Sequence, residues 1–390
     1  MLEIHIKSIQ FDDVCQVRCI LSFGGSDDAI LTKTSANVSD YLDTDRADAF
    51  VVGLLHYAME HKYDIRSDVP ISEDLYYNLE FHFIDAIAHE GSGLYRTRLR
   101  VTTIPVVKKK GGIVATGISC GVDCLHTIYV HEEVQIPSYK ITHLGFYNVG
   151  SHQTGKGKEF DNYLYDGRFK LCQSFAEEYG YCFYTINSNI HEVIERQGGY
   201  SHICNHSYMA AFCILLLQKG ISRYYYSAGY PYTDFRVNKS HKAEELDSAM
   251  YDLLTFYCIS IGGMTVYSAG GNIKRIDKTR ILATYKPAQK YLNVCVNEPH
   301  NDSTCFKCVR TLLSIDATGT IDDFKDVFDI EKYKINKPRY VRKMWFDAIF
   351  MHDEFCQEIL PLYRRQITIP MRVISLAENW KQLVVKVLGR

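Results

Sequence analysis

The chain has 390 residues, of which 46% are hydrophobic and 23% charged, and a formal net charge of −2. This length suits roughly two or three domains, and the composition is that of a globular protein, which excludes a disordered or fibrous chain. The near-zero charge excludes a globally basic surface, so we expect no nucleic-acid partner. The apolar runs are shorter than the roughly 20 residues that a membrane span requires, and the amino terminus lacks the pattern of a signal peptide. We therefore expect a cytoplasmic protein with no membrane partner.

Residues 1–110 predict an accessory α+β domain. Apolar residues alternate as in strands in three segments, which are Leu2–Phe11, Val14–Phe23 and Arg96–Ile104. Between them, Asp45–Ala58 has the apolar spacing of a helix, and Ser72 is a good N-cap for a further helix. The segment Lys108–Gly112, three lysines followed by two glycines, predicts an exposed connector.

From residue 111 to 320 the chain alternates short apolar strands with helices, which predicts a parallel sheet with helices on both faces. The expected strands are Ile113–Ile118, Thr142–Asn148, Tyr181–Ile186, Tyr224–Ser227 and Met264–Tyr267. The expected helices between them include Phe169–Glu178, Ile203–Lys219 and Asp247–Ser260. Ligands bind such sheets at the carboxyl ends of the strands. Residues 321–390 predict a helical tail, with amphipathic stretches at Arg339–Tyr363 and Leu376–Val387.

A polar turn, Ser119–Cys124, joins the first strand of this sheet to a helix. Backbone N–H groups and the dipole at a helix N-terminus favour a bound phosphate. Gly121 lets the backbone approach a ligand closely, and the Ser119 hydroxyl can donate to an oxyanion. The carboxylate of Asp123 can hold Mg²⁺ beside the phosphates. The turn therefore predicts a phosphate site.

This turn resembles the PP-loop, Ser-Gly-Gly-x-Asp-Ser, of the N-type ATP pyrophosphatases, a family that includes the 7-cyano-7-deazaguanine synthases. The match holds at Ser119, Gly121 and Asp123, whereas Cys120 replaces the middle glycine and Cys124 the final serine. A side chain at position 120 is expected to crowd the loop, and a thiol donates more weakly than a hydroxyl. The resemblance implies that eight residues bind ATP and Mg²⁺: Ser119, Cys120, Gly121, Val122, Asp123, Cys124, Arg275 and Lys278. Of these, it implies catalytic roles for Ser119, Asp123 and Lys278. Asn148 and Gly229 are further candidates for ATP binding, because they lie at strand ends on the ligand edge of the sheet.

A cysteine-rich segment, 291–311, predicts a zinc site. The thirteen cysteines of the chain do not form a disulfide pattern, but Cys295, Cys305 and Cys308 are spaced so that they can supply three thiolates to a tetrahedral Zn²⁺. His300 offers an imidazole as the fourth ligand. There are two alternatives: a catalytic zinc with water in the fourth position, or a site that has lost its metal, in which Cys305 and Cys308 are plain thiols.

The same segment resembles the zinc-binding tail of the 7-cyano-7-deazaguanine synthases and their uncharacterised relatives. The match to the tail pattern Asn-Cys-Gly-x-Cys-x-Lys-Cys-x-Arg-Thr falls on Asn301, Cys305, Lys307, Cys308, Arg310 and Thr311. Asp302 stands where the pattern has a fourth cysteine, so it competes with His300 as the fourth ligand.

The two motifs together imply a PP-loop fold of the HUP type, which is Rossmann-like, over roughly Ile113–Gly319. They also imply an ATP-dependent ligase, in which a substrate carboxylate attacks the α-phosphate of MgATP and pyrophosphate leaves. Ammonia or an amine then captures the acyl-adenylate. The carboxylate belongs to a small molecule or a protein, and a partner protein and an oligomeric state stay open.

Two other functions compete with this one. A sulfurtransferase would use Cys120 or Cys124 as a persulfide carrier, which requires a thiol of low pKa at the helix N-terminus. A binding module in a bacterial defence or biosynthetic system would have a decayed loop and a partner that supplies the activity.

Three further groups of residues are weaker candidates. His202 and His206 share one face of a helix, where they bind metal or substrate or fill the core. Asn148, Ser188 and Asn189 end strands, where adenine contacts arise, and Gly229 either touches ATP or forms a turn.

Overall fold

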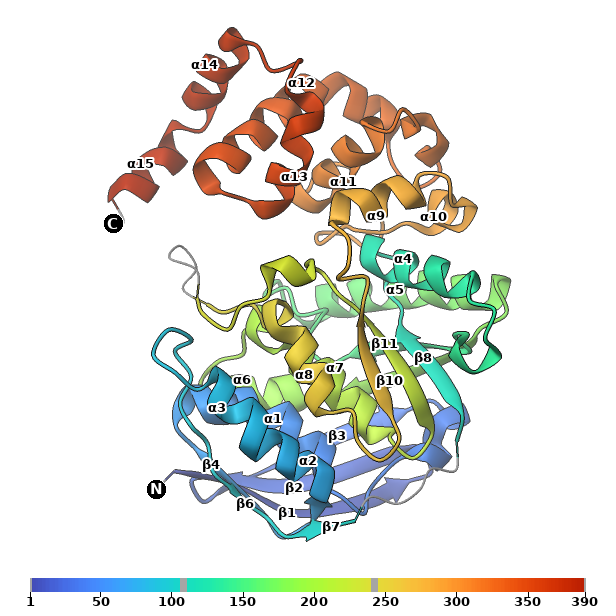
Figure 1. Cartoon of the computed structure of the whole chain (residues 1–390), viewed down its shortest axis with the longest axis vertical. Coiled ribbons are helices and arrows are strands. Elements are labelled where there is room, and N and C mark those ends of the chain that lie inside the picture. Colours follow the sequence, from blue (N-terminus) through green and yellow to red (C-terminus); the bar gives the residue numbers. More distant parts are fainter. Residues whose placement is uncertain (1, 106–110, 240–244, 389–390) are drawn as a thin grey trace.

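The computed structural model describes residues 2–105, 111–239 and 245–388 (Figure 1). Within these ranges, one sheet of ten strands runs through the molecule in the order β12-β11-β8-β9-β10-β3-β2-β1-β4-β6. Lys108, Lys109 and Lys110 of the expected connector lie outside the described residues. No helix in the described ranges is long and apolar enough to cross a bilayer.

Five neighbouring strands form a parallel block, as the sequence predicts. They are β8 (Ile113–Gly117), β9 (His143–Asn148), β10 (Cys182–Ser188), β11 (Ile221–Ser227) and β12 (Thr265–Ala269). Both faces of the block are buried: Ile113 and Ala115 of β8 belong to one apolar cluster, and Val114 between them belongs to the other. A strand covered on both faces is apolar throughout, which is why these segments show little alternation.

The amino-terminal strands extend the same sheet. β1 (Glu3–Asp13), β2 (Gln16–Phe23) and β3 (Ser26–Thr34) form an antiparallel meander, and β3 pairs antiparallel with β10. β4 (Asp64–Ser67) and β6 (Leu99–Arg100) complete the edge beside β1. The strands on the two sides of residue 110 therefore share one hydrogen-bonded sheet.

The prediction of a single strand over Arg96–Ile104 is wrong. Only Leu99–Arg100 and Thr103–Ile104 are extended and paired, and they belong to different sheets. The second pair, β7 (Thr103–Ile104), joins β5 (Ile71–Ser72) in a separate two-stranded sheet. The chain passes from the large sheet to the small one between β6 and β7. The apolar alternation continues across this point and therefore does not reveal the change.

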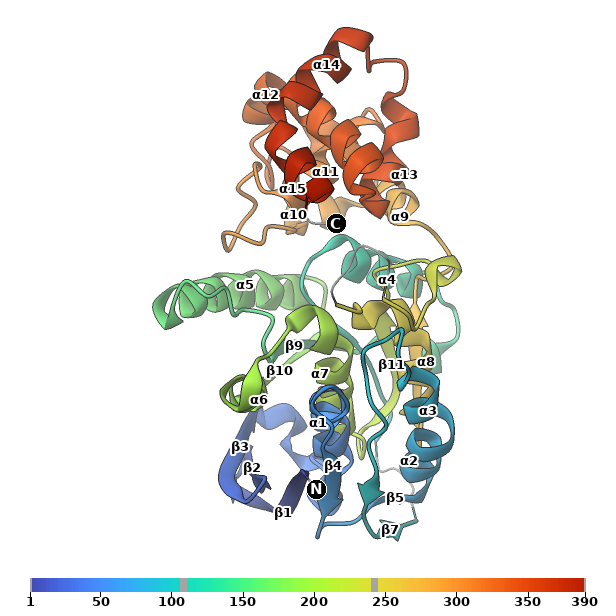
Figure 2. The ribbon, with the colours of Figure 1, turned by 90° about the vertical axis from the view of Figure 1, so that its left-hand side faces the viewer.

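Helices cover both faces of the parallel block, in agreement with the prediction (Figures 1 and 2). The cluster on one face takes its helical side chains mainly from α1 (Asp48–His61), α2 (Glu73–Asn78), α3 (Ile84–Ile87), α6 (Ile190–Gly198), α7 (His202–Leu216) and α8 (Asp252–Cys258). The cluster on the other face includes α4 (Val122–Glu132) and α5 (Lys158–Glu178). α5 begins eleven residues before the expected Phe169. The sequence does not predict this first half, because it is largely polar and exposed.

The carboxyl-terminal part is helical, as predicted, and lies over the carboxyl edge of the parallel strands (Figures 1 and 2). Its helices are α9 (Arg275–Leu282), α10 (Lys286–Tyr291), α11 (Phe306–Asp316), α12 (Ile330–Phe346), α13 (Glu354–Tyr363), α14 (Ile369–Glu378) and α15 (Trp380–Leu388). Each of the two amphipathic stretches expected here, Arg339–Tyr363 and Leu376–Val387, is divided between two helices. A turn of π-helix and left-handed His352, with a φ of 53°, separate α12 from α13, and Asn379 separates α14 from α15.

Candidate functional site

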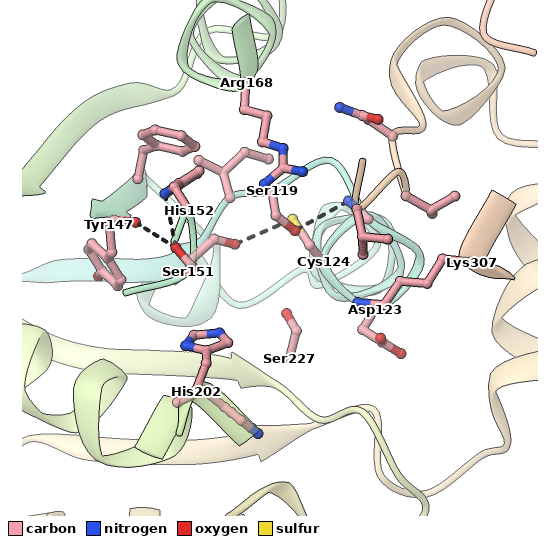
Figure 3. Close-up of a pocket in the computed structure, with 18 of the residues that line it drawn as sticks. Ser119, Asp123, Cys124, Tyr147, Ser151, His152, Arg168, His202, Ser227 and Lys307 are labelled. Carbon is pink, nitrogen blue, oxygen red and sulfur yellow. Dashed lines mark hydrogen bonds between the residues drawn. The ribbon is translucent and has the colours of Figure 1, made fainter. Parts of the chain in front are cut away.

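A cavity of about 760 Å³ opens where β8, β9 and β11 end, below the helical tail (Figure 3). Its walls include the turn after β8, the segment after β9, the start of α7 and the loop that precedes α11. The carboxyl edge of a parallel sheet is where ligands bind in open α/β folds, so the cavity has the position that the sequence predicts.

The turn Ser119–Cys124 presents the N-terminus of α4 to this cavity. Gly121 is the N-cap residue and its N–H donates to Ser119 Oγ at 3.3 Å. Ser119, Gly121 and Val122 line the cavity, and the Ser119 side chain is exposed there. The first amides of an eleven-residue helix therefore face the cavity, and amides in this position can bind an anion.

The expected crowding by Cys120 is wrong. Cys120 adopts a left-handed conformation with a φ of 56°, the region that glycine favours, and its side chain is fully buried. Its Sγ lies 3.9 Å from Cys172 Sγ of α5, below the turn, and Cys120 is not part of the cavity wall. The substituted position thus costs backbone strain and leaves the cavity-facing side of the turn open.

Cys124 also turns inward. Its thiol donates to the Gly117 carbonyl at 3.3 Å, and burial raises its pKa to about 12. Burial likewise raises the pKa of Cys120. Both shifts are opposite to the lowered pKa that a persulfide carrier at this helix N-terminus requires.

Asp123, the acidic residue of the turn, is paired with two cations of α9. Its Oδ2 accepts from Arg275, and its Oδ1 accepts from Lys278 Nζ at 3.1 Å. Lys278 is 1% exposed and also donates to the Ala228 carbonyl at 2.7 Å, and burial lowers its pKa to about 7. Arg275 lines the cavity, whereas Lys278 lies behind Asp123 and outside the wall.

The cavity wall carries far more positive than negative charge. Its cations are Lys156, Arg168, Arg275, Lys307 and Arg310, and Asp123 is its one carboxylate among the described residues. Burial lowers the pKa of Lys307 to about 8, and burial also lowers the pKa of Arg310. Such shifts mark cations that are held out of water without enough counter-charge, and they favour an anionic ligand.

The sequence missed four of these cations as ligand contacts, namely Lys156, Arg168, Lys307 and Arg310. Arg168 lies on α5 and donates to the Cys295 carbonyl at 2.9 Å, and nothing in its local sequence marks it. Lys307 and Arg310 stand out only as part of the cysteine pattern. The α11 helix that begins at Phe306 aims both toward the cavity.

The cysteine segment forms a compact candidate metal centre. One ligand atom from each of Cys295, Asp302, Cys305 and Cys308 lies within 4.8 Å of the others, so this cluster can hold a metal ion such as zinc. Hydrogen bonds from Cys305 and Cys308 lower the pKa of Cys295. His300 is exposed and lies outside this group, so the structure favours Asp302 of the two candidate fourth ligands.

The weaker candidates separate into two groups. Asn148, Ser188 and Asn189 line a second cavity of about 350 Å³, between β10 and the amino-terminal strands. There Asn189 bonds the Leu31 N–H and Ser188 accepts from Thr32, so these two residues fasten β10 to β3. Gly229 lines neither cavity. His202 and His206 both line the main cavity.

The site as a whole combines helix amides, mostly half-buried cations and one carboxylate beside a cluster of thiols and a carboxylate. This set can bind a polyanion together with a divalent cation, and it can hold a second metal 
in the neighbouring loop. Comparison of the chain with protein-family models, with curated proteins and with solved structures finds no match.

Proposed function

We propose that the protein is an ATP-dependent ligase, which activates a carboxylate by adenylation and transfers the acyl group to ammonia or an amine. The observation that carries the proposal is the cavity at the carboxyl edge, where α4 amides and five cations face one carboxylate. A triphosphate matches this charge pattern, and the volume of about 760 Å³ accommodates a nucleotide with a second substrate.

The residues of the turn have separate tasks in this proposal. The α4 amides and the Ser119 hydroxyl bind the phosphates that leave as pyrophosphate, and Arg275 moves from Asp123 to a phosphate oxygen. Asp123 is then free to hold Mg²⁺, which would neutralise charge on the phosphates. Fixed donors and cations stabilise the charge that develops as the α-phosphate is attacked.

The thiol cluster has a structural task in this proposal. The loop it would pin runs from Asn293 to Cys305, and the Asn293 N–H donates to the Cys120 carbonyl at 2.8 Å. A metal bound by Cys295, Asp302, Cys305 and Cys308 would therefore hold the loop against the phosphate turn and orient α11 with its two cations.

A sulfurtransferase fits the site less well, because the thiols of Cys120 and Cys124 are buried and their pKa values are raised. A binding module without catalysis remains the second candidate. The open cavity-facing side of the turn favours retained ATP binding. The experiment below distinguishes the ligase from the binding module.

The test is calorimetric titration of MgATP into the zinc-loaded protein. We expect micromolar binding that weakens by roughly tenfold or more in Ser119→Ala and Arg310→Gln, since each removes a hydrogen bond to a charged group. Arg196→Gln is the charge-matched control, because Arg196 pairs with Asp28 outside the cavity. Binding would then justify screening carboxylates for release of AMP and pyrophosphate. Absence of binding in the unaltered protein would contradict the proposal and favour the decayed module.

A further inference from the structure

A chain of three hydrogen-bonded side chains lies on the wall that β11 and α7 contribute to the cavity. The Tyr226 hydroxyl is 2.9 Å from His206 Nδ1, and His206 Nε2 is 2.9 Å from Asp247 Oδ1. Tyr226 and His206 both line the cavity. Of the three histidines in the wall, His206 is the one with a carboxylate partner, since His152 bonds Ser151 and His202 bonds Tyr200.

The chemistry of the three groups fixes the direction of their hydrogen bonds. An ionised carboxylate only accepts, so His206 carries its proton on Nε2 and donates it to Asp247. The other ring nitrogen, Nδ1, then accepts from the Tyr226 O–H. In this order a carboxylate orients an imidazole, and the imidazole accepts a proton from a hydroxyl. The same arrangement activates the nucleophile or base in many enzymes.

The surroundings hold each group in place. Asp247 also accepts from the Ala249 N–H at 2.9 Å and from the Tyr230 hydroxyl at 3.3 Å. Burial acts to raise the pKa of Asp247, but the hydrogen bonds from His206, Ala249 and Tyr230 outweigh it, and the pKa lies below its usual range. The Tyr226 ring packs against Phe256 with 4.2 Å between the ring centroids.

We propose that Tyr226, His206 and Asp247 form a proton relay that serves as the general base for the acceptor amine. The inference rests on the proposed ligase function and deepens it. As the amine nitrogen bonds to the acyl carbon, the bond from that carbon to AMP breaks and AMP leaves. The amine proton passes to the Tyr226 oxygen, and the proton of Tyr226 passes to His206 Nδ1. Asp247 stabilises the imidazolium.

A nucleotide-directed electrophile tests the relay without knowledge of the acceptor. In fluorosulfonylbenzoyl adenosine a sulfonyl fluoride takes the place of the ATP phosphates. Attack by Tyr226 forms an O–S bond, expels fluoride and sends the phenol proton to His206. We expect Tyr226 to be labelled, as mapped by mass spectrometry of peptides, and MgATP to protect it. Tyr147, which lines the same cavity but bonds the Tyr184 hydroxyl, should stay unlabelled.

The variants separate activation from mere accessibility. His206→Gln and Asp247→Asn keep Tyr226 but should slow its labelling by roughly a hundredfold, the lower range of general-base assistance. His143→Gln, the same change at the amino end of β9, should leave the rate unchanged. Thermal melts and MgATP titration of each variant show whether it is folded and binds the nucleotide.

Two outcomes would overturn the relay and leave the nucleotide site intact. One is ATP-protected labelling of a lysine such as Lys307 instead of Tyr226, and the other is labelling of Tyr226 at the same rate in His206→Gln. Absence of protected labelling also overturns it. The separate MgATP titration then decides whether the ligase function fails as well.

Discussion

At the residue scale, Asp123 acts as an internal counter-ion for the cations that would meet a phosphate. It pairs with Arg275, which is partly exposed to the cavity, and with Lys278, which is buried. An anion that enters the cavity must compete with this carboxylate for Arg275. A carboxylate released from its cations is also the ligand that Mg²⁺ prefers.

The variant Asp123→Asn should therefore change ATP binding in two opposite ways. Without Mg²⁺, the affinity for ATP should rise by about tenfold, because a competing charged hydrogen bond is removed. Addition of Mg²⁺ should no longer strengthen binding, because the carboxylate that we propose as the Mg²⁺ ligand is lost. Titrations with and without Mg²⁺ measure both effects. Asp277→Asn on α9, where Asp277 pairs with Arg280, is the control. Weaker binding under both conditions would contradict the counter-ion role.

Lys278 should make the free energy of unfolding depend on pH. Burial lowers its pKa to about 7 in the folded protein, whereas an unfolded lysine has a pKa of about 10.4. Between these values unfolding takes up one proton, so a rise in pH opposes unfolding. Relative to Lys278→Met, the free energy of unfolding should rise by about 1.4 kcal/mol per pH unit between roughly pH 7.5 and 9.5. Urea unfolding at several pH values measures this slope, and parallel curves for the two proteins would refute it.

At the element scale, the thiol cluster joins the loop after α10 to the first turn of α11. Cys305 is the N-cap of α11 and its sulfur accepts from the Cys308 N–H at 3.4 Å. Asp302 accepts from the N–H groups of Thr304 and Cys305, both at 2.8 Å. The same few residues thus cap a helix and converge on one point, and this geometry ties metal binding to the placement of Lys307 and Arg310.

Two substitutions distinguish the fourth ligand of this centre. Asp302→Asn keeps an acceptor for the two amides but loses the charge, so zinc affinity should fall by about tenfold or more. His300→Ala should leave it unchanged, since His300 lies outside the cluster. Competition with a chromogenic chelator measures the affinity. The reverse ranking would make His300 the ligand, and protein purified free of bound metal that also fails to take up added zinc would reject the centre.

Much of the element pattern was predictable, because the buried parallel strands and amphipathic helices leave strong periodicities. β3 was missed because its Ser26-Asp27-Asp28 start is polar, although it forms a hairpin with β2. Its second partner, β10, follows some 150 residues later. Ser72 does occupy the N-cap of α2, but its hydroxyl bonds Asp48 instead of the helix. At the site, the turn and the cysteines were visible as local patterns. The partners Arg168, Asp247 and Tyr226 were not, because only the tertiary fold brings them to the cavity.

At the scale of the whole molecule, one sheet separates two apolar clusters and joins all parts of the chain. The amino-terminal strands and α1 belong to one cluster, and the tail helices share the other with Val114 and Leu144. A buried polar network joins the amino-terminal region to the residues that directly follow α7. Asp48 is fully buried and accepts from Ser72 and from Gln218, whose amide also donates to Asp43.

The two tryptophans, Trp345 and Trp380, both lie in the helical tail, so their fluorescence reports on the tail alone. If the shared sheet makes the chain one cooperative unit, Asp48→Ala should shift the fluorescence and far-ultraviolet ellipticity transitions together. The expected loss is about 3 kcal/mol, because Ser72 and Gln218 are left buried without their acceptor. Asp45→Ala, which removes an exposed ion pair with Lys219, should cost less than about 1 kcal/mol. A fluorescence transition that stays in place while the ellipticity shifts would mean that the tail unfolds independently, so that the cavity between tail and sheet opens without global unfolding.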